Sequence, residues 1–143
     1  MRRALFPGSF NPFTIGHLDI VHRGLDLFDE VIIAVGTNQD KPAADYEARL
    51  AQINTSITHD RVRVTCYTGL TADYCKEVDA QFILRGLRNA QDMEYEYAIA
   101  EANRHLTGIE TVCLLAKGEH RFLSSSIVRD IDRNGGDTSN LLP

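Results

Sequence analysis

The sequence predicts an α/β fold with a five-stranded parallel sheet and helices on both faces. Short apolar runs alternate with stretches whose apolar residues recur every three or four positions, which is the pattern of βαβ units. Residues 31–35, Val-Ile-Ile-Ala-Val, are apolar without alternation, as in a strand that is covered on both faces. The chain has 143 residues, so we expect residues 1–143 to form a single domain.

Each element follows from a local pattern. Strands are expected at residues 4–6, 31–35, 62–66, 82–84 and 111–115. Helices are expected over 14–28, 46–57, 70–78, 92–105 and 124–132. Pro7 and Gly8 end the first strand, because proline lacks an N–H and glycine adopts backbone angles that other residues avoid. We expect Thr14 to cap the first helix and Gly108 to end the fourth.

Composition excludes several classes of protein. Hydrophobic residues make up 43% and charged residues 24%, which is ordinary for a globular domain. No apolar run has membrane-spanning length, and we expect no signal peptide in the segment that begins Met1-Arg2-Arg3. The three cysteines form no C-x-x-C pair, which favours reduced thiols in a cytoplasmic protein. The net charge of −5 argues against non-specific nucleic-acid binding.

The stretch from Ala4 to His17 is the strongest functional signal. A strand, a loop with Gly8 and a helix N-terminus place backbone N–H groups where they can bind phosphate. Neither the Gly-x-Gly-x-x-Gly fingerprint nor a Walker Gly-Lys-Ser/Thr is present, and His17 stands where those loops have glycine or lysine. The alternative is that Gly8 and Gly16 are turn and cap residues and that His17 is a surface side chain.

Four loops are expected to meet at one edge of the sheet. They are residues 9–17, the loop with Lys41, residues 85–88 and residues 120–126, and each follows a predicted strand. Ligands of parallel sheets bind at the carboxyl ends of strands, near the switch in strand order. We therefore expect a binding site for an anionic ligand at this edge.

Arg85 and Arg88 flank a glycine at a strand end. Their guanidinium groups repel one another unless an anion lies between them, so they favour a phosphate site. Ion pairs with Asp92 or Glu94 are the alternative.

Three consecutive serines, 124–126, open the last helix. One serine is an ordinary N-cap, whereas three supply the extra hydroxyl and N–H groups that a polyphosphate requires. Lys41 lies in a polar loop, where a lone lysine is usually solvated, and its case depends on its position after the second strand.

A metal site and a covalent mechanism are not indicated. His17 and His22 are five residues apart, not the four of a zinc-binding helix, and no acidic partner completes a site. No Ser-His-Asp or Cys-His arrangement follows from the order of residues.

The pattern Gly-Ser-Phe-Asn-Pro-x-Thr-x-Gly-His at 8–17 resembles the N-terminal signature of the nucleotidyltransferase superfamily. The later motifs resemble the phosphopantetheine adenylyltransferase family from residue 3 to the end of the chain. They are Arg-Gly-Leu-Arg at 85–88, Asp-x-Glu-Tyr-Glu at 92–96, Asn-Arg-His at 103–105 and Phe-Leu-Ser-Ser-Ser-x-Val-Arg at 122–129. The resemblance implies a Rossmann-like nucleotidyltransferase fold.

The resemblance also implies roles for single residues. Its implied catalytic residues are His17, Lys41 and Arg88. Its implied ATP-binding residues are Ser9, Phe10, His17, Gly86, Leu87, Arg88, Glu96, His120, Arg121, Phe122, Leu123, Ser124, Ser125 and Ser126. Its implied phosphopantetheine-binding residues are Ser9, Lys41, Thr71 and Arg85. Thr71 replaces a frequent methionine or leucine, and His120 replaces a frequent tryptophan.

The activity implied is transfer of adenylate from ATP to 4′-phosphopantetheine, which gives dephospho-coenzyme A and pyrophosphate in coenzyme A biosynthesis. Magnesium is expected with the triphosphate, coenzyme A as a feedback inhibitor, and a homohexamer as the assembly. The chain ends at Leu142-Pro143, where family members usually continue into a short helix, so we expect that helix to be absent or trimmed.

Two alternatives remain open. A nucleotidyltransferase with another acceptor, such as nicotinamide mononucleotide or glycerol 3-phosphate, would share the first loop and the serine-rich helix. A non-catalytic nucleotide-binding protein would share the fold and could lack His17 and Lys41. For a catalytic His17, the helix macrodipole is expected to lower the pKa of the imidazole and keep it neutral.

Overall fold

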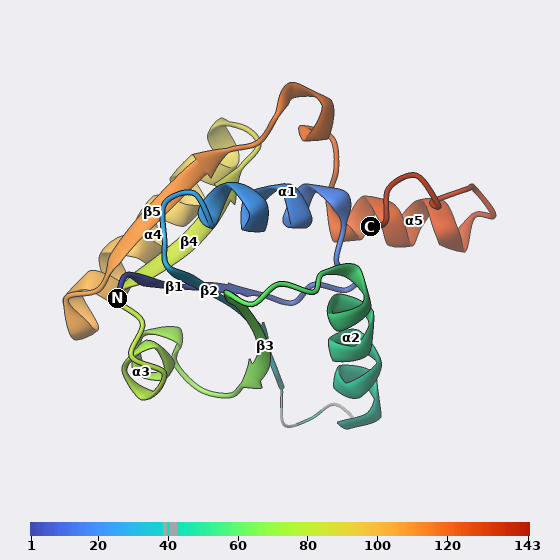
Figure 1. Cartoon of the computed structure of the whole chain (residues 1–143). Coiled ribbons are helices and arrows are strands. Elements are labelled where there is room, and N and C mark those ends of the chain that lie inside the picture. Colours follow the sequence, from blue (N-terminus) through green and yellow to red (C-terminus); the bar gives the residue numbers. More distant parts are fainter. Residues whose placement is uncertain (39, 41–42) are drawn as a thin grey trace.

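The computed structural model describes residues 1–38, 40 and 43–143, and it confirms the predicted sheet (Figure 1). Five parallel strands lie in the order β3-β2-β1-β4-β5. The strands are β1 (Arg3–Gly8), β2 (Glu30–Gly36), β3 (Val62–Tyr67), β4 (Phe82–Leu87) and β5 (Glu110–Leu115). The helices are α1 (Ile15–Gly24), α2 (Ala43–Ser56), α3 (Thr71–Glu77), α4 (Ala90–Thr107) and α5 (Ser125–Arg133), with a short 3₁₀ turn at Gly118–His120.

The two faces of the sheet are buried under different helices. On one face, Phe6 and Ile33 pack with apolar side chains of α1 and α2, among them Val21 and Ile53. On the other face, Leu5 and Ile32 pack with α3, while α4 lies along β4 and β5. Neighbouring residues of β1 and β2 therefore enter opposite cores, which is why these strands read as continuous apolar runs.

The strand order reverses direction between β1 and β4, and there the two strands part. β1 pairs with β2 along its whole length, from Arg3 to Gly8. With β4 it pairs only at Ala4 and Leu5. Pro7 has no N–H to offer a ladder, which agrees with the early end of the pairing with β4. The strand itself continues through Pro7 and Gly8 beside β2, so the prediction that these residues end it was wrong. The gap that opens is a crevice at the switch point of the sheet, the usual binding place in open α/β folds.

Some element bounds differ from the prediction. The first helix ends at Gly24, although Leu25 and Phe28 continue its buried stripe from the turn that follows. A Cβ atom at Gly24 would lie 2.7 Å from Cδ2 of Leu84, so glycine permits the close approach of α1 to β4. β4 extends to Leu87, which places Arg85 in the strand itself. Gly108 ends α4 with a left-handed φ of 76°, as predicted.

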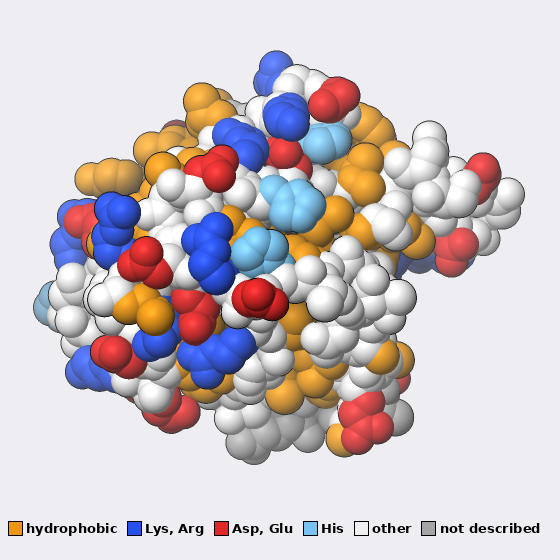
Figure 2. All heavy atoms as spheres, viewed as in Figure 1, with side chains coloured by type: hydrophobic (Ala, Val, Ile, Leu, Met, Phe, Trp, Pro, Cys, Tyr) orange, Lys and Arg blue, Asp and Glu red, His pale blue; other side chains and the backbone are white. Residues whose placement is uncertain are grey.

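The last helix lies apart from the sheet (Figure 1). Leu123, Val128 and Leu141 form a small separate core with Ile15 at its edge. The N–H of Ile15 donates to the carbonyl of Leu141 at 3.0 Å, which ties the start of α1 to the C-terminal segment. Among the described residues, no helix combines the length and the hydrophobicity that a membrane span needs. Figure 2 shows acidic and basic side chains interspersed over one face.

Candidate active site

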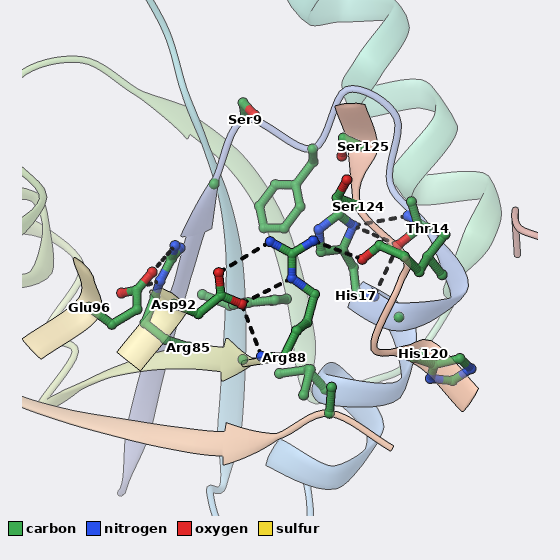
Figure 3. A pocket seen from close by; sticks show the side chains of 18 of the residues that line it. Ser9, Thr14, His17, Arg85, Arg88, Asp92, Glu96, His120, Ser124 and Ser125 are labelled. Carbon is green, nitrogen blue, oxygen red and sulfur yellow. Dashed lines mark hydrogen bonds and ion pairs between the residues drawn. The ribbon is translucent and has the colours of Figure 1, made fainter. Parts of the chain in front are cut away.

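A pocket occupies the crevice between β1 and β4 (Figure 3). Three of the four loops predicted to converge line it: the loop after β1, the end of β4 and the segment after β5. The predicted site residues that line it are Ser9, Phe10, His17, Arg85, Gly86, Arg88, Glu96, His120, Leu123, Ser124 and Ser125. The prediction for Lys41 falls outside the described residues.

His17 is held by the start of its own helix. Thr14 caps α1, because its Oγ1 accepts a hydrogen bond from the backbone N–H of His17 at 3.3 Å (Figure 3). In return, the backbone N–H of Thr14 donates to Nδ1 of the His17 ring at 3.0 Å. This is a capping box with histidine in place of the usual Glu or Gln. Because Nδ1 accepts from a backbone N–H, the neutral ring carries its proton on Nε2.

Aromatic rings enclose His17. Phe13 stacks on it with centroids 5.4 Å apart, and Phe10 meets it edge to face at 5.0 Å. Burial, followed by the positive charges of Arg85 and Arg88, lowers the pKa of His17 to about 4. The lowered pKa agrees in direction with the sequence-based expectation, but its causes are burial and the two arginines. His17 is therefore a neutral hydrogen-bond donor at pH 7.

Arg85 is fixed by a buried carboxylate. Its Nε and Nη2 donate to the two oxygens of Glu96 at 2.9 and 2.6 Å, and Nη1 donates to the carbonyl of Pro7. Glu96 is only 5% exposed, and such a bidentate pair is what makes a buried carboxylate tolerable. The guanidinium thus spans the gap between β1 and β4. The ion pair expected for these arginines exists here with Glu96, not with Glu94.

Arg88 has a similar partner on the first turn of α4. Its Nε donates to Oδ2 of Asp92 at 3.0 Å, and Nη1 donates to the carbonyl of Leu123 at 3.2 Å. Burial works to raise the pKa of Asp92, but the hydrogen bonds from Arg88 outweigh it and hold that pKa below its ordinary value. Both arginines are therefore neutralised by carboxylates within the protein, which is the alternative that the sequence left open.

The three serines each have a different partner. Ser124 is the N-cap of α5 and accepts from the N–H of Ile127 at 3.2 Å. Ser125 donates to the carbonyl of Pro12 at 2.8 Å, and Ser126 accepts from Arg129 at 3.1 Å. Ser124 and Ser125 line the pocket, and the hydroxyl group of Ser125 joins the serine-rich segment to the loop after β1.

A second pocket adjoins the first and shares Arg85 and Glu96 with it. Thr71 lies in its wall, where its hydroxyl group is 2.8 Å from the hydroxyl group of Tyr67. Thr71 is thus separated from the residues around His17. The rest of this wall includes Ile83, Ile99, Asn103 and Thr111.

Some predicted residues do not line either pocket. Leu87 is buried in β4, and Phe122 is 54% exposed. Arg121 donates from Nε to the carbonyl of Arg88 at 3.1 Å, and Ser126 pairs with Arg129. Sequence reasoning also missed residues that do line the first pocket, notably Tyr95 and Ile20. Tyr95 lies within the motif at 92–96 and Ile20 follows the motif at 8–17, but neither was assigned a role, because their place in the pocket depends on how α4 and α1 pack beside β4.

Comparisons with known proteins agree with this geometry. Residues 5–131 match the profile of the family described as Cytidylyltransferase-like. The phosphopantetheine adenylyltransferase of Flavobacterium psychrophilum is 52% identical over 145 aligned positions, which cover 100% of this chain and 96% of that protein. The phosphopantetheine adenylyltransferase of a Nocardioides species is 46% identical, covering 100% and 91%.

Solved structures support the fold. A putative nicotinate-nucleotide adenylyltransferase from Vibrio parahaemolyticus superposes with a TM-score of 0.71 at 17% identity, covering 99% of this chain and 87% of that one. A bifunctional NMN adenylyltransferase/ADP ribose pyrophosphatase from Francisella tularensis gives 0.68 at 16% identity, covering 99% and 44%. At such identities the likeness concerns the fold alone. Together with the matches along the full sequence, these findings show that the chain belongs to the phosphopantetheine adenylyltransferase family of nucleotidyltransferases.

Proposed function

We propose that the two adjoining pockets bind ATP and 4′-phosphopantetheine and that His17 and Arg85 lie where the substrates meet. The observation that carries the proposal is the shared wall: Arg85 and Glu96 line both pockets, and His17 lines the first. Full-length relatives named phosphopantetheine adenylyltransferase support the same substrates. Adenylate would pass from ATP to the phosphate of the acceptor, releasing pyrophosphate.

The chemistry needs no general base, because a phosphate acceptor is already ionised at pH 7. Its oxygen attacks the α-phosphorus in line with the leaving pyrophosphate, and the barrier comes from bringing anions together. His17 donates one hydrogen bond from Nε2 to the α-phosphoryl oxygens. That bond strengthens as charge accumulates in the transition state, so it favours turnover over ground-state binding.

The arginines bind phosphate with the N–H groups that their carboxylates leave free. Each guanidinium has five N–H donors, and the internal contacts of Arg85 and Arg88 use only part of them. The carboxylates orient the two cations before substrate arrives. Lys41 would add a cation at the acceptor phosphate, which is a role that rests on the resemblance.

Magnesium would enter with the triphosphate. Within the described part of the chain, no cluster of three histidine, cysteine or carboxylate groups is arranged to hold a metal. Oxygens of the triphosphate and water would therefore supply most of its ligands. The ion would neutralise phosphate charge that the paired arginines cannot.

A ligand panel tests the assignment of substrates. ATP with Mg²⁺, 4′-phosphopantetheine and dephospho-coenzyme A should each raise the melting temperature, whereas NAD and CTP should not. At about 100 times its Kd, a ligand adds roughly 2.7 kcal/mol to the free energy of unfolding. Stabilisation by nicotinamide mononucleotide or CTP without stabilisation by phosphopantetheine would assign another acceptor.

Replacing His17 should separate catalysis from binding. His17→Ala removes a preorganised donor, so kcat should fall by about 10²–10³-fold while the Kd for ATP changes only a few-fold. His17→Gln retains a donor and should keep part of the rate. Steady-state kinetics and equilibrium ATP binding measure the two effects. A variant that turns over at the wild-type rate but binds ATP poorly would make His17 a binding residue.

The lowered pKa of His17 predicts a pH dependence of stability. The unfolded chain protonates this histidine near its ordinary pKa of 6.5, and the folded protein does so near 4. Between these values the unfolded state binds more protons, so the free energy of unfolding should fall as pH falls. His17→Gln should flatten the curve in this window by up to about 1.4 kcal/mol per pH unit. Urea unfolding at several pH values measures it, and parallel curves would contradict it.

Self-association is a further part of the proposal. Large apolar side chains of α4 are exposed in the single chain: Met93, Tyr95, Tyr97, Ile99 and Leu106. Exposed apolar side chains of this size suit contact with another copy, and the family resemblance implies a homohexamer. Sedimentation velocity at micromolar concentration should find the hexamer, and a monomer throughout would contradict it. A cytoplasmic location stays a prediction from the cysteine pattern, and inhibition by coenzyme A stays a prediction from the resemblance.

A further inference from the structure

The loop after β1 has few backbone partners within the sheet or the helices. Side chains from two helices bind its carbonyl groups instead. From α5, Ser125 donates to Pro12 at 2.8 Å and Arg129 donates to Asn11 at 2.5 Å. These hydrogen bonds tie the loop to α5 through side chains that lie outside it.

Two residues of α2 hold the ends of the same loop. Gln52 accepts from the N–H of Phe13 at 2.9 Å and donates to its carbonyl at 2.8 Å. One turn earlier, Nη1 of Arg49 donates to the carbonyl of Ser9 at 3.0 Å. Residues three apart share a face of a helix, so α2 presents both groups to the loop together. Gln52 does not line either pocket.

The contact with Phe13 leads directly to His17. Phe13 is fully buried, and its ring stacks on the imidazole at an angle of 26°. The next residue is Thr14, whose N–H selects the tautomer of His17. Gln52 binds both backbone groups of Phe13. The Phe13 carbonyl and the Thr14 N–H belong to the same planar peptide unit, so Gln52 helps to fix the direction of this N–H.

We propose that Gln52 is a positioning residue for catalysis, which acts on the orientation and tautomer of His17 through Phe13 and Thr14. The consequence for rate rests on the proposed function, whereas the consequence for His17 does not. A misplacement of about 1 Å at a reacting group can cost about 10²-fold in rate. Gln52 would therefore matter for turnover although it touches neither substrate.

Gln52→Ala in the full chain tests the proposal, with Asn54→Ala as the matched control on the exposed side of α2. Gln52→Ala should lower kcat by about 10–10²-fold and change the KM for ATP by less than about threefold. Gln52→Glu keeps the acceptor for Phe13 N–H and should recover part of the rate. It also serves if the alanine variant does not fold, which circular dichroism will show.

Spectra of ¹⁵N-labelled histidine give a readout that is independent of turnover. The His17 signals, assigned by their loss in His17→Gln, should report the Nε2–H tautomer in the wild type and in Asn54→Ala. In Gln52→Ala they should move toward a mixture of tautomers. Unchanged His17 signals with an unchanged kcat would overturn the proposal, even if the melting temperature falls. If no substrate is turned over at all, the proposed function fails and the spectra still decide the role of Gln52.

Discussion

The parting of β1 and β4 beyond Leu5 is the constraint on which the site depends. A ladder continued past Leu5 would fill the crevice with paired backbone, and Arg85 would have no gap to cross. Instead its guanidinium donates to the carbonyl of Pro7 and joins the two strands through a side chain. Because Pro7 cannot donate to a ladder, β1 and β4 separate at the switch in strand order, and the pocket lies between them.

The same arrangement explains the electrostatics of the pocket. A partly buried guanidinium without a partner is unfavourable, and Glu96 and Asp92 offset that cost with hydrogen bonds of fixed direction. The pairs are close to neutral, yet the two arginines still help to keep His17 uncharged. The site therefore combines two arginine cations held by carboxylates with an uncharged histidine.

Patterns that act within one element were predictable from the sequence. The five strands, the Thr14 cap, the break at Gly108 and the cap at Ser124 all depend on near neighbours along the chain. The partner of Arg85 was not predictable from the sequence. Whether Glu94 or Glu96 faces Arg85 depends on how α4 is rotated about its axis where it packs against β4. Gln52 was missed for the same reason. From sequence, a polar residue beside the apolar stripe of a helix is expected to face solvent, and only the folded structure brings the loop after β1 next to it.

The cap of α1 couples the stability of the first helical turn to the tautomer of His17. In most capping boxes the third helical residue is Glu or Gln, whose side chain only caps the helix. Fraying of the first turn then removes only helical hydrogen bonds. Here that residue is His17, so the hydrogen bond that begins the helix also decides which ring nitrogen carries the proton. Each time the first turn opens, the imidazole is free to exchange tautomers and the donor is lost. Under the proposed role of His17, the fraction of active molecules therefore cannot exceed the fraction whose first helical turn is closed, however stable the rest of the chain is.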